Sequence, residues 1–181
     1  MDALDAIMTR RSVRKFTADD VSDSEVDVLL HAAMAAPSAS NERSWRFVVV
    51  RDREKLARLA KATPFAGALA AAPVGIVVAA DRKAMKYPGF WVIDCSAAIE
   101  NMLLAAHAAG LGGVWIGVHP IKPFAWNVSR AVGLPRSVVP HSLVALGHPV
   151  SMPGSVDRFE DGWVNLDAWG GVWPARGSSP R

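Results

Sequence analysis

A dense group of basic residues near the start of the chain has the clearest capacity for chemistry. Three arginines and a lysine fall within six positions around one serine, in the order Arg10, Arg11, Ser12, Arg14 and Lys15. Guanidinium groups this close together repel one another, so an anion is expected between them. Phosphate suits best, because a guanidinium donates two parallel charge-assisted hydrogen bonds to its oxygens and Ser12 can donate to the same oxygens. The alternative is a solvated basic helix end that complements the helix dipole.

A second segment favours the phosphate interpretation. It follows one intervening helix and reads Pro37-Ser38-Ala39-Ser40-Asn41-Glu42-Arg43-Ser44-Trp45. Together the two segments resemble the FMN-dependent nitroreductase family. That family opens with Arg-x-Ser-x-Arg/Lys-x-Phe and continues with a Pro-Ser-x-x-Asn-x-Gln-Pro-Trp loop that enters a strand. Further matches extend to about Arg158, so the resemblance covers most of the chain.

The resemblance implies an FMN cofactor bound by three groups of residues. The phosphate would be held by Arg10, Arg14 and Arg158, with Ser12 at the phosphate-ribityl end and Arg11 as a further cofactor-binding residue. The flavin would be approached from one loop by Pro37, Ser38, Ser40 and Asn41. Its N5 and O4 edge would face the main chain of Trp115, Ile116 and Gly117. The small residues Gly112, Gly113 and Gly117 are expected to let a flat ring approach the backbone.

The reaction that the resemblance implies is a ping-pong hydride transfer. NADH or NADPH would reduce flavin N5 and leave, and a nitro-aromatic, quinone or related acceptor would take the electrons. Because the flavin carries this chemistry, no catalytic side chain is assigned. Two departures from the family pattern, Arg43-Ser44 in place of Gln-Pro and Gly117 where an acid is frequent, would favour reduced, anionic flavin.

Other functions of the same chain stay open at this point. It could be a flavoenzyme of the same superfamily with another reaction, such as reductive dehalogenation or azoline oxidation, or a non-catalytic module that binds or stores flavin. Rapid bleaching of the flavin by NADH or NADPH would distinguish an enzyme from a storage module. A candidate aromatic lid for a substrate is formed by Tyr87, Phe90 and Trp91, with core packing as an equal explanation.

Composition narrows the class of protein. The 181 residues, 51% hydrophobic, suit one domain with a sizeable core. The net charge is +3, and beyond the first cluster the basic residues are scattered among acids. This pattern does not indicate the continuous basic surface that binds nucleic acid. The five histidines show no metal-ligand spacing, and one cysteine, Cys95, makes neither a zinc site nor an internal disulfide. The residues after Asp2 do not form the apolar core of a signal peptide. We expect a cytoplasmic protein that neither associates with a membrane nor binds a metal ion.

Helices that alternate with short apolar strands must position these residues. We expect helices over 2–11, from a Ser22–Glu25 capping box to Pro37, from Asp52 to Ala62, and over 91–109 and 123–132. We expect strands over 45–50, 74–80, 138–146 and after the glycines at 112, with Pro140 indicating a late start or an edge strand. The fold class is α+β, a mixed and mostly antiparallel sheet flanked by helices, in one domain over residues 1–160.

The segment Trp91–Ala109 is the longest helix and is apolar almost all the way round. A small domain cannot cover such a helix by itself, so a subunit interface is expected, with a central core helix as the alternative. The resemblance favours the interface, because it implies an intertwined homodimer built around a long central helix. The tail 161–181 carries Trp163, Trp169 and Trp173, and we expect it to pack on its own body or on the partner subunit.

Overall fold

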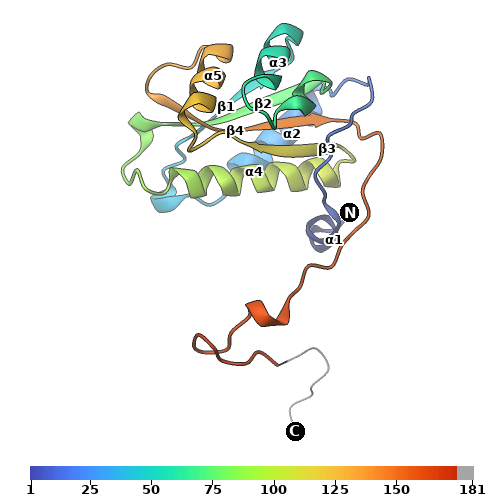
Figure 1. Ribbon diagram of the computed structural model, residues 1–181, viewed down its shortest axis with the longest axis vertical. Coiled ribbons are helices and arrows are strands. Elements are labelled where there is room, and N and C mark those ends of the chain that lie inside the picture. The colour runs from blue at the N-terminus through green and yellow to red at the C-terminus, as the bar shows by residue number, and fades with distance from the viewer. Residues whose placement is uncertain (175–181) are drawn as a thin grey trace.

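One four-stranded sheet organises the chain, and the computed structural model describes residues 1–174 of it (Figure 1). The strand order is β1-β2-β4-β3, with β1 Trp45–Val50, β2 Val74–Asp81, β4 Val138–Gly147 and β3 Gly112–Gly117, all paired antiparallel. The helices are α1 Ala3–Thr9, α2 Asp23–Met34, α3 Arg53–Ala60, α4 Trp91–Ala108 and α5 Lys122–Val132. Short 3-10 turns lie at Ala39–Asn41, Gly67–Ala70, Arg82–Ala84 and Asp161–Trp163.

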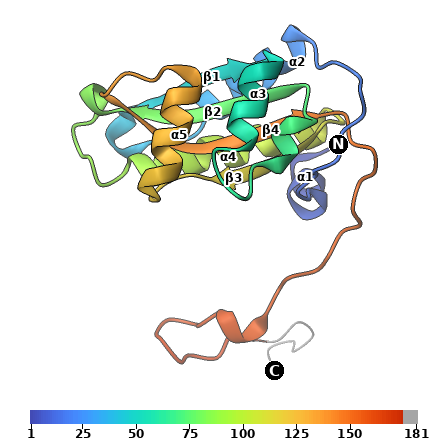
Figure 2. The ribbon, with the colours of Figure 1, turned by 45° about the horizontal axis from the view of Figure 1, so that its top comes forward.

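Helices cover both faces of the sheet, which explains why its interior strands are apolar throughout (Figure 2). Along β2, Ile76 and Val78 pack with α2 and α4, whereas the intervening Val77 packs with α3 and α5. The alternation follows from the period of two in an extended strand. The molecule therefore has three layers, with α2 and α4 on one side and α3 and α5 on the other.

Local sequence signals set most of the element boundaries. The capping box is present, since the Ser22 hydroxyl accepts from Glu25 N and the Glu25 carboxylate accepts from Ser22 N. The Asp52 side chain caps α3, and Gly133 ends α5 in the left-handed conformation at φ 72°. The first helix is shorter than expected, because it begins after the Asp2 cap and ends at Thr9.

The α+β fold class is confirmed. The expected mixed character of the sheet is limited, within the described residues, to one parallel bridge beside the four antiparallel strands. Ser12 pairs parallel with Gly113 at the outer edge of β3. The expectation for Pro140 is wrong, because β4 begins at Val138 and is an interior strand. Pro140 is tolerated because β3 pairs only from Ser142 onward and the register against β2 shifts between Val78 and Ala79.

The α4 helix is a core helix on one side and exposed on the other. Cys95, Ala98 and Met102 are fully buried against the sheet, whereas Ile93 is 62% exposed. Half-buried Ala97 and Leu104 continue the outer side at helical spacing. None of the helices within residues 1–174 combines the length and apolar content that crossing a membrane requires.

The tail leaves the body on the side of α1 and extends away from it as an arm (Figure 1, Figure 2). Trp163 and Trp169 are 80% and 96% exposed, so the described part of the tail does not pack on its own body. Within 151–174 one β-bridge, between Asn165 and Val172, joins the tail to itself, and short turns such as Trp163 N to Glu160 O supply its other main-chain hydrogen bonds. Residues 175–181 lie outside the described part of the chain.

Candidate functional site

A cavity of about 550 Å³ lies beside β3 and is named here the β3 cavity. Its lining includes Arg14, Phe65, Trp115, Ile116, Gly117 and Phe124. The cavity therefore joins the basic segment to the β3 residues, two of the three segments that the sequence selects. Its volume is in the range of small-molecule and cofactor sites.

Arg14 reaches this cavity because the residues before it run along the edge of β3. Val13 N donates to Gly113 O at 2.9 Å, and the Val13 side chain is buried in the core between the sheet and α3. Successive side chains of an extended segment alternate in direction. Anchoring Val13 inward therefore leaves Arg14 outward, at the mouth of the cavity.

The glycines of β3 have two different roles. A Cβ on Gly112 would lie 2.7 Å from Val13 Cγ1 and one on Gly113 would lie 2.9 Å from Leu103 Cδ2. The expectation that these two glycines admit a flat ring is therefore wrong, because their missing side chains are needed for packing inside the chain. A Cβ on Gly117 would meet nothing within 4 Å, so only this position is open to a ligand.

The two roles give a matched pair of substitutions. Gly112→Ala should lower the free energy of unfolding by ~1–3 kcal/mol, because it overpacks against the stiff, β-branched Val13. Gly117→Ala, in the same strand, should change it by less than about 0.5 kcal/mol. Urea unfolding followed by circular dichroism measures both. Equal losses in the two variants would contradict the assignment.

A chain of hydrogen bonds holds the indole of Trp115, a residue that lines the β3 cavity. Trp115 Nε1 donates to Ser142 Oγ at 2.6 Å, and Ser142 Oγ lies 2.9 Å from His141 Nδ1. His141 Nε2 lies 3.5 Å from Ser96 Oγ, which donates to Val92 O at 2.7 Å. All donors and acceptors match if the imidazole is neutral and carries its proton on Nε2.

Burial keeps that imidazole neutral. His141 is 5% exposed, and burial, followed by the charge of His119, lowers the pKa of His141 to about 4. Trp91 packs edge-on against both rings, at centroid distances of 4.7 Å to His119 and 5.8 Å to His141. The group is therefore structural, and it fixes the position of the Trp115 indole.

His141 should make the fold sensitive to acid. The unfolded chain protonates this imidazole near its ordinary pKa of 6.5, whereas the folded chain does so only near 4, so the unfolded state binds more protons in between. Stability from this group is fully present above about pH 6.5 and should decrease by about 3 kcal/mol as the pH falls toward 4. Thermal melts across this range measure the loss. His141→Gln should flatten the profile, and the exposed His31→Gln should not.

A second cavity, of about 360 Å³, is named here the arginine cavity. It is lined by Ile7, Met8, Arg10, Arg11, Val156, Asp157, Arg158 and Phe159. Arg10 Nε pairs with Glu100 Oε1 at 3.1 Å, and Arg11 donates to Val156 O at 3.1 Å. Burial lowers the pKa of His107, and the charges of Arg10 and Arg11 lower it further. Of the three arginines predicted to hold the phosphate, Arg10 and Arg158 line this cavity together, whereas Arg14 lines the β3 cavity.

The loop from Pro37 to Arg43 has a strained backbone. Ser40, Asn41 and Arg43 have φ values of 49°, 56° and 49°, in the left-handed region that non-glycine residues rarely adopt. Strain of this kind costs ~1–3 kcal/mol per residue and concentrates at functional sites. The loop is held by its own contacts, since Ser38 Oγ accepts from Arg43 N at 3.1 Å.

Asp94 of α4 anchors the same loop. Its Oδ1 accepts from Ala39 N at 3.0 Å, and its buried Oδ2 has no partner within the described residues. In the sequence, Asp94 is a charged residue within a largely apolar helix, and that interruption is the available signal. Pro37, Ser38, Ser40 and Asn41 line neither the β3 cavity nor the arginine cavity, so the third predicted segment lies apart from both.

The comparisons with known proteins agree with these segments. The family model described as "Nitroreductase family" matches residues 7–64 and 63–148. The chain belongs to the nitroreductase family. A relative from Methanothermobacter thermautotrophicus, provisionally named an NADH dehydrogenase/NAD(P)H nitroreductase, is 44% identical over 169 residues, which cover 93% of this chain and 88% of the relative.

Solved structures of nitroreductases and related reductases share the fold. A provisionally named nitroreductase of Desulfovibrio desulfuricans, in complex with FMN, is 35% identical with a TM-score of 0.83, covering 93% of this chain and 98% of the other. An NADPH:FMN oxidoreductase of Vibrio harveyi, complexed with NAD+, is 29% identical with a TM-score of 0.81, covering 92% and 77%.

The remaining residues predicted from the sequence of this chain lie partly in the core and partly on the surface. Trp91 packs on the two histidines, so core packing accounts for it. Tyr87 and Phe90 are half exposed, and the main-chain N–H of Tyr87 donates to Glu42 Oε1 at 2.8 Å, which ties this segment to the strained loop. Ser44 is fully buried, so this departure from the family pattern lies in the core.

The donor set of the chain fits a flavin phosphate. Arg11 Nε is buried and has no partner among the described residues, beside two further guanidinium groups in the arginine cavity. A buried donor without a partner is costly, and a phosphate oxygen would satisfy it. The open backbone at Gly117 and the volume of the β3 cavity suit a flat ring. Phe65 and Phe124, which sequence reasoning missed, add apolar walls and carry no sequence signal beyond their hydrophobicity.

Proposed function

We propose that this nitroreductase is an FMN-dependent NAD(P)H oxidoreductase. The observation that carries the proposal is that Arg14 and the backbone of Trp115–Gly117 share one cavity, in a chain of this family. FMN, when bound, accepts a hydride at N5 from NADH or NADPH and passes the electrons to a nitro-aromatic, a quinone or a related acceptor. The relative that is complexed with FMN and the relative named for NADPH and FMN support this assignment.

The residues of the chain bind and orient the cofactor. Arg10, Arg11 and Arg158 hold the phosphate, with Ser12 beside them at the ribityl end. Arg14 lies at the ring instead, where its fixed positive charge stabilises negative charge on a reduced ring. Trp115, fixed through Ser142 and His141, supports the ring and keeps water from that side of it.

The active unit is a homodimer, which explains where the loop from Pro37 to Asn41 acts. Within one chain this loop lines neither cavity, so its Ser38, Ser40 and Asn41 approach the flavin of the partner subunit. A second copy would also cover the apolar side chains that one chain leaves exposed on α1 and α4. Leu4 is 74% exposed, Met8 58% and Ile93 62%.

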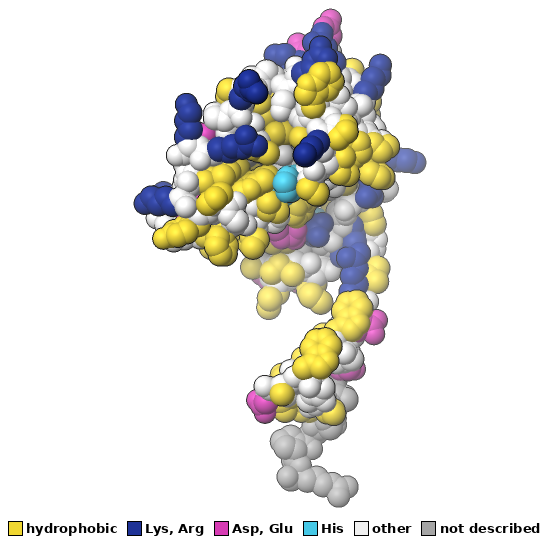
Figure 3. Space-filling model, turned by 60° about the vertical axis from the view of Figure 1, so that its left-hand side comes forward, with side chains coloured by type: hydrophobic (Ala, Val, Ile, Leu, Met, Phe, Trp, Pro, Cys, Tyr) yellow, Lys and Arg dark blue, Asp and Glu magenta, His cyan; other side chains and the backbone are white. Residues whose placement is uncertain are grey.

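The tail is the second element that a partner would cover. Hydrophobic side chains run along the arm beyond the body (Figure 3), and Trp163 and Trp169 are among the most exposed side chains of the tail. Exposed tryptophans on an extended arm are costly in water, and they are favourable against an apolar surface. The tail of each subunit therefore packs on the body of its partner, and this exchange of tails makes the dimer intertwined.

The test is the visible spectrum of the purified protein. We expect a yellow protein that releases FMN, and not FAD, on denaturation, because the arginine cavity suits a terminal phosphate. Stopped-flow mixing with NADH or NADPH without oxygen should then bleach the flavin within seconds. A colourless protein that takes up no added FMN would remove the proposal, and bound FMN that neither donor bleaches would indicate a storage module.

A further inference from the structure

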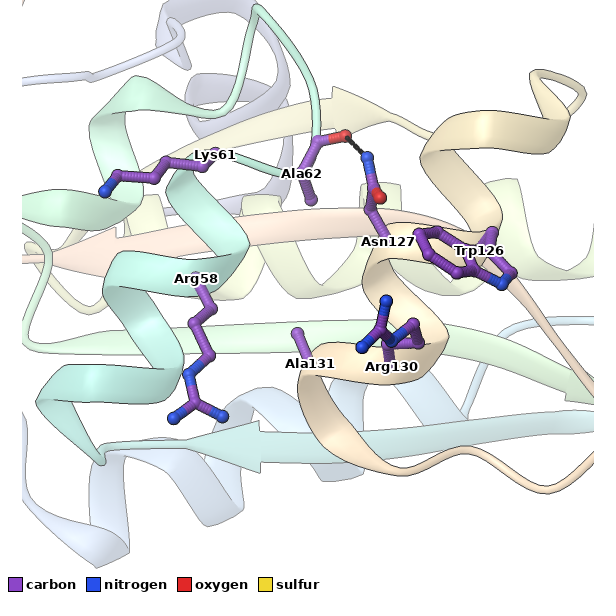
Figure 4. A pocket seen from close by; sticks show the side chains of 7 residues that line it. All are labelled: Arg58, Lys61, Ala62, Trp126, Asn127, Arg130 and Ala131. Atoms are coloured by element: carbon purple, nitrogen blue, oxygen red, sulfur yellow. Dashed lines mark hydrogen bonds between the residues drawn. The ribbon is translucent and has the colours of Figure 1, made fainter.

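A groove between α3 and α5 lies on the side of the sheet opposite α4 (Figure 4). Its volume is about 430 Å³, and it is lined by Arg58, Lys61, Ala62, Trp126, Asn127, Arg130 and Ala131. None of the residues assigned to the flavin belongs to it. Figure 4 shows Arg58 on α3 and Arg130 on α5, with Ala131 between them in this view.

The charged residues that line this groove are all positive. Three of its seven lining residues are cationic and none is acidic. Arg58 pairs with Glu54 at 3.5 Å on an exposed surface, where such pairs contribute little. Within residues 1–174 no carboxylate lies within 4 Å of Lys61 or Arg130. Lys and Arg side chains are spread over this upper part of the body (Figure 3), and an anion between them would relieve their repulsion.

An exposed aromatic ring stands beside these cations. Trp126 is 59% exposed, and the Arg130 guanidinium carbon lies 4.6 Å from the centroid of its ring. Asn127 Nδ2 donates to Ala62 O at 3.1 Å, which fixes the amide across the groove and leaves its Oδ1 able to accept. A flat exposed indole next to cations can stack a nucleobase while the cations hold its phosphate.

The groove is next to the β3 cavity along the same helix. Phe124 lines the β3 cavity, and Asn127, three residues later, lines the groove. Residues three apart on a helix are neighbours, ~5–6 Å between Cβ atoms. The two sites are also close together in the turns after α3, where Ala62 lines the groove and Phe65 lines the β3 cavity. A ligand that occupies the β3 cavity can therefore extend into the groove.

We propose that this groove binds a nucleoside phosphate, with Lys61 and Arg130 on the phosphate and Trp126 on the base. The nucleoside phosphate has two sources: the adenosine-phosphate end of NADH or NADPH, which rests on the proposed function, or a free nucleotide. Because Arg58 and Arg130 lie in the last turns of their helices, a purely structural role as dipole partners is the competing explanation. That role leaves the exposure of Trp126 unexplained.

The first measurement is titration of the oxidised protein with ADP by calorimetry, which needs no turnover. Trp126→Ala should weaken ADP by about 5- to 150-fold through lost stacking, whereas Trp126→Phe should retain most of the affinity. Lys61→Ala should weaken ADP by at least about tenfold and reduce its dependence on salt. Lys83→Ala, which removes the same charge elsewhere, is the control and should change nothing. Absence of ADP binding, or binding that all these variants retain, would overturn the proposal.

Steady-state kinetics then distinguish the two sources. If the site holds the end of the hydride donor, ADP competes with it and Lys61→Ala raises the KM for NADPH with kcat unchanged. If the site holds a free nucleotide, ADP binds but KM for NADPH stays the same in the variant. Either outcome supports the nucleoside-phosphate site. A flavin that no nicotinamide reduces would remove the proposed function and leave the ADP titration interpretable.

Discussion

Ile93→Glu should convert the proposed homodimer into a monomer and release its flavin. Ile93 is 62% exposed on the outer side of α4 and would be covered by the partner subunit. An unpaired charge buried at such an interface costs ~3–5 kcal/mol, which weakens association by roughly 150- to 5,000-fold. Because the loop from Pro37 to Asn41 would serve the partner's flavin, FMN affinity should decrease together with association. Analytical ultracentrifugation and the flavin content of the separated species measure both.

The matched control is Trp126→Glu, which adds the same charge on the opposite layer of the molecule. It should leave the sedimentation coefficient and the flavin content unchanged, because α5 lies on the side of the sheet opposite α4 and is not part of the proposed interface. Circular dichroism shows whether Ile93→Glu still folds. A folded monomer that keeps FMN at unchanged affinity would contradict the shared interface.

The position of Ile93 also shows what the sequence could not decide. A helix that is apolar all round predicts burial on every side, but it does not say which side its own sheet covers. In the structure Ala98 is fully buried in the chain's own core, whereas Ile93, five residues earlier, faces outward. A charge at Ala98 would therefore test folding, and a charge at Ile93 tests association.

Features that depend on neighbours in sequence were predictable. The capping box at Ser22 and the start of α3 at Asp52 are local signals and are present as expected, and Gly133, which ends α5, is a signal of the same local kind. The strands follow from β-branched runs that the two helical layers must cover. In the same way, the order of the basic segment, the loop and β3 was enough to identify the family.

Features that depend on long-range packing were not predictable. Gly112 and Gly113 look the same as Gly117 in the sequence, and only the positions of Val13 and Leu103 separate a packing glycine from an open one. Arg14 is four residues from Arg10, but the extended segment along β3 carries it into a different cavity. The backbone strain in the loop from Pro37 to Arg43 could not be predicted from its residue types, because the residues with positive φ are Ser40, Asn41 and Arg43 and none of them is a glycine.

The separation of Arg10 from Arg14 makes the phosphate and the ring independently testable. Arg10→Ala should remove a charge-assisted hydrogen bond worth ~1.5–3 kcal/mol and weaken FMN by roughly 10- to 150-fold. Riboflavin has no phosphate, so its affinity should change little in the same variant. Arg14→Ala, acting at the ring, should weaken FMN and riboflavin alike. Quenching of flavin fluorescence on titration measures all four affinities.

Two further comparisons exclude indirect effects of Arg10→Ala. The pair between Arg10 and Glu100 is partly exposed, and pairs of this kind contribute ~0–1 kcal/mol, so the variant should remain folded. Arg51→Ala also breaks ion pairs, to Asp20 and Asp23, but away from both cavities, and it should leave both affinities unchanged. A solvated basic helix end predicts no difference between the ligands. Equal losses of FMN and riboflavin in Arg10→Ala would therefore remove the phosphate role of this arginine.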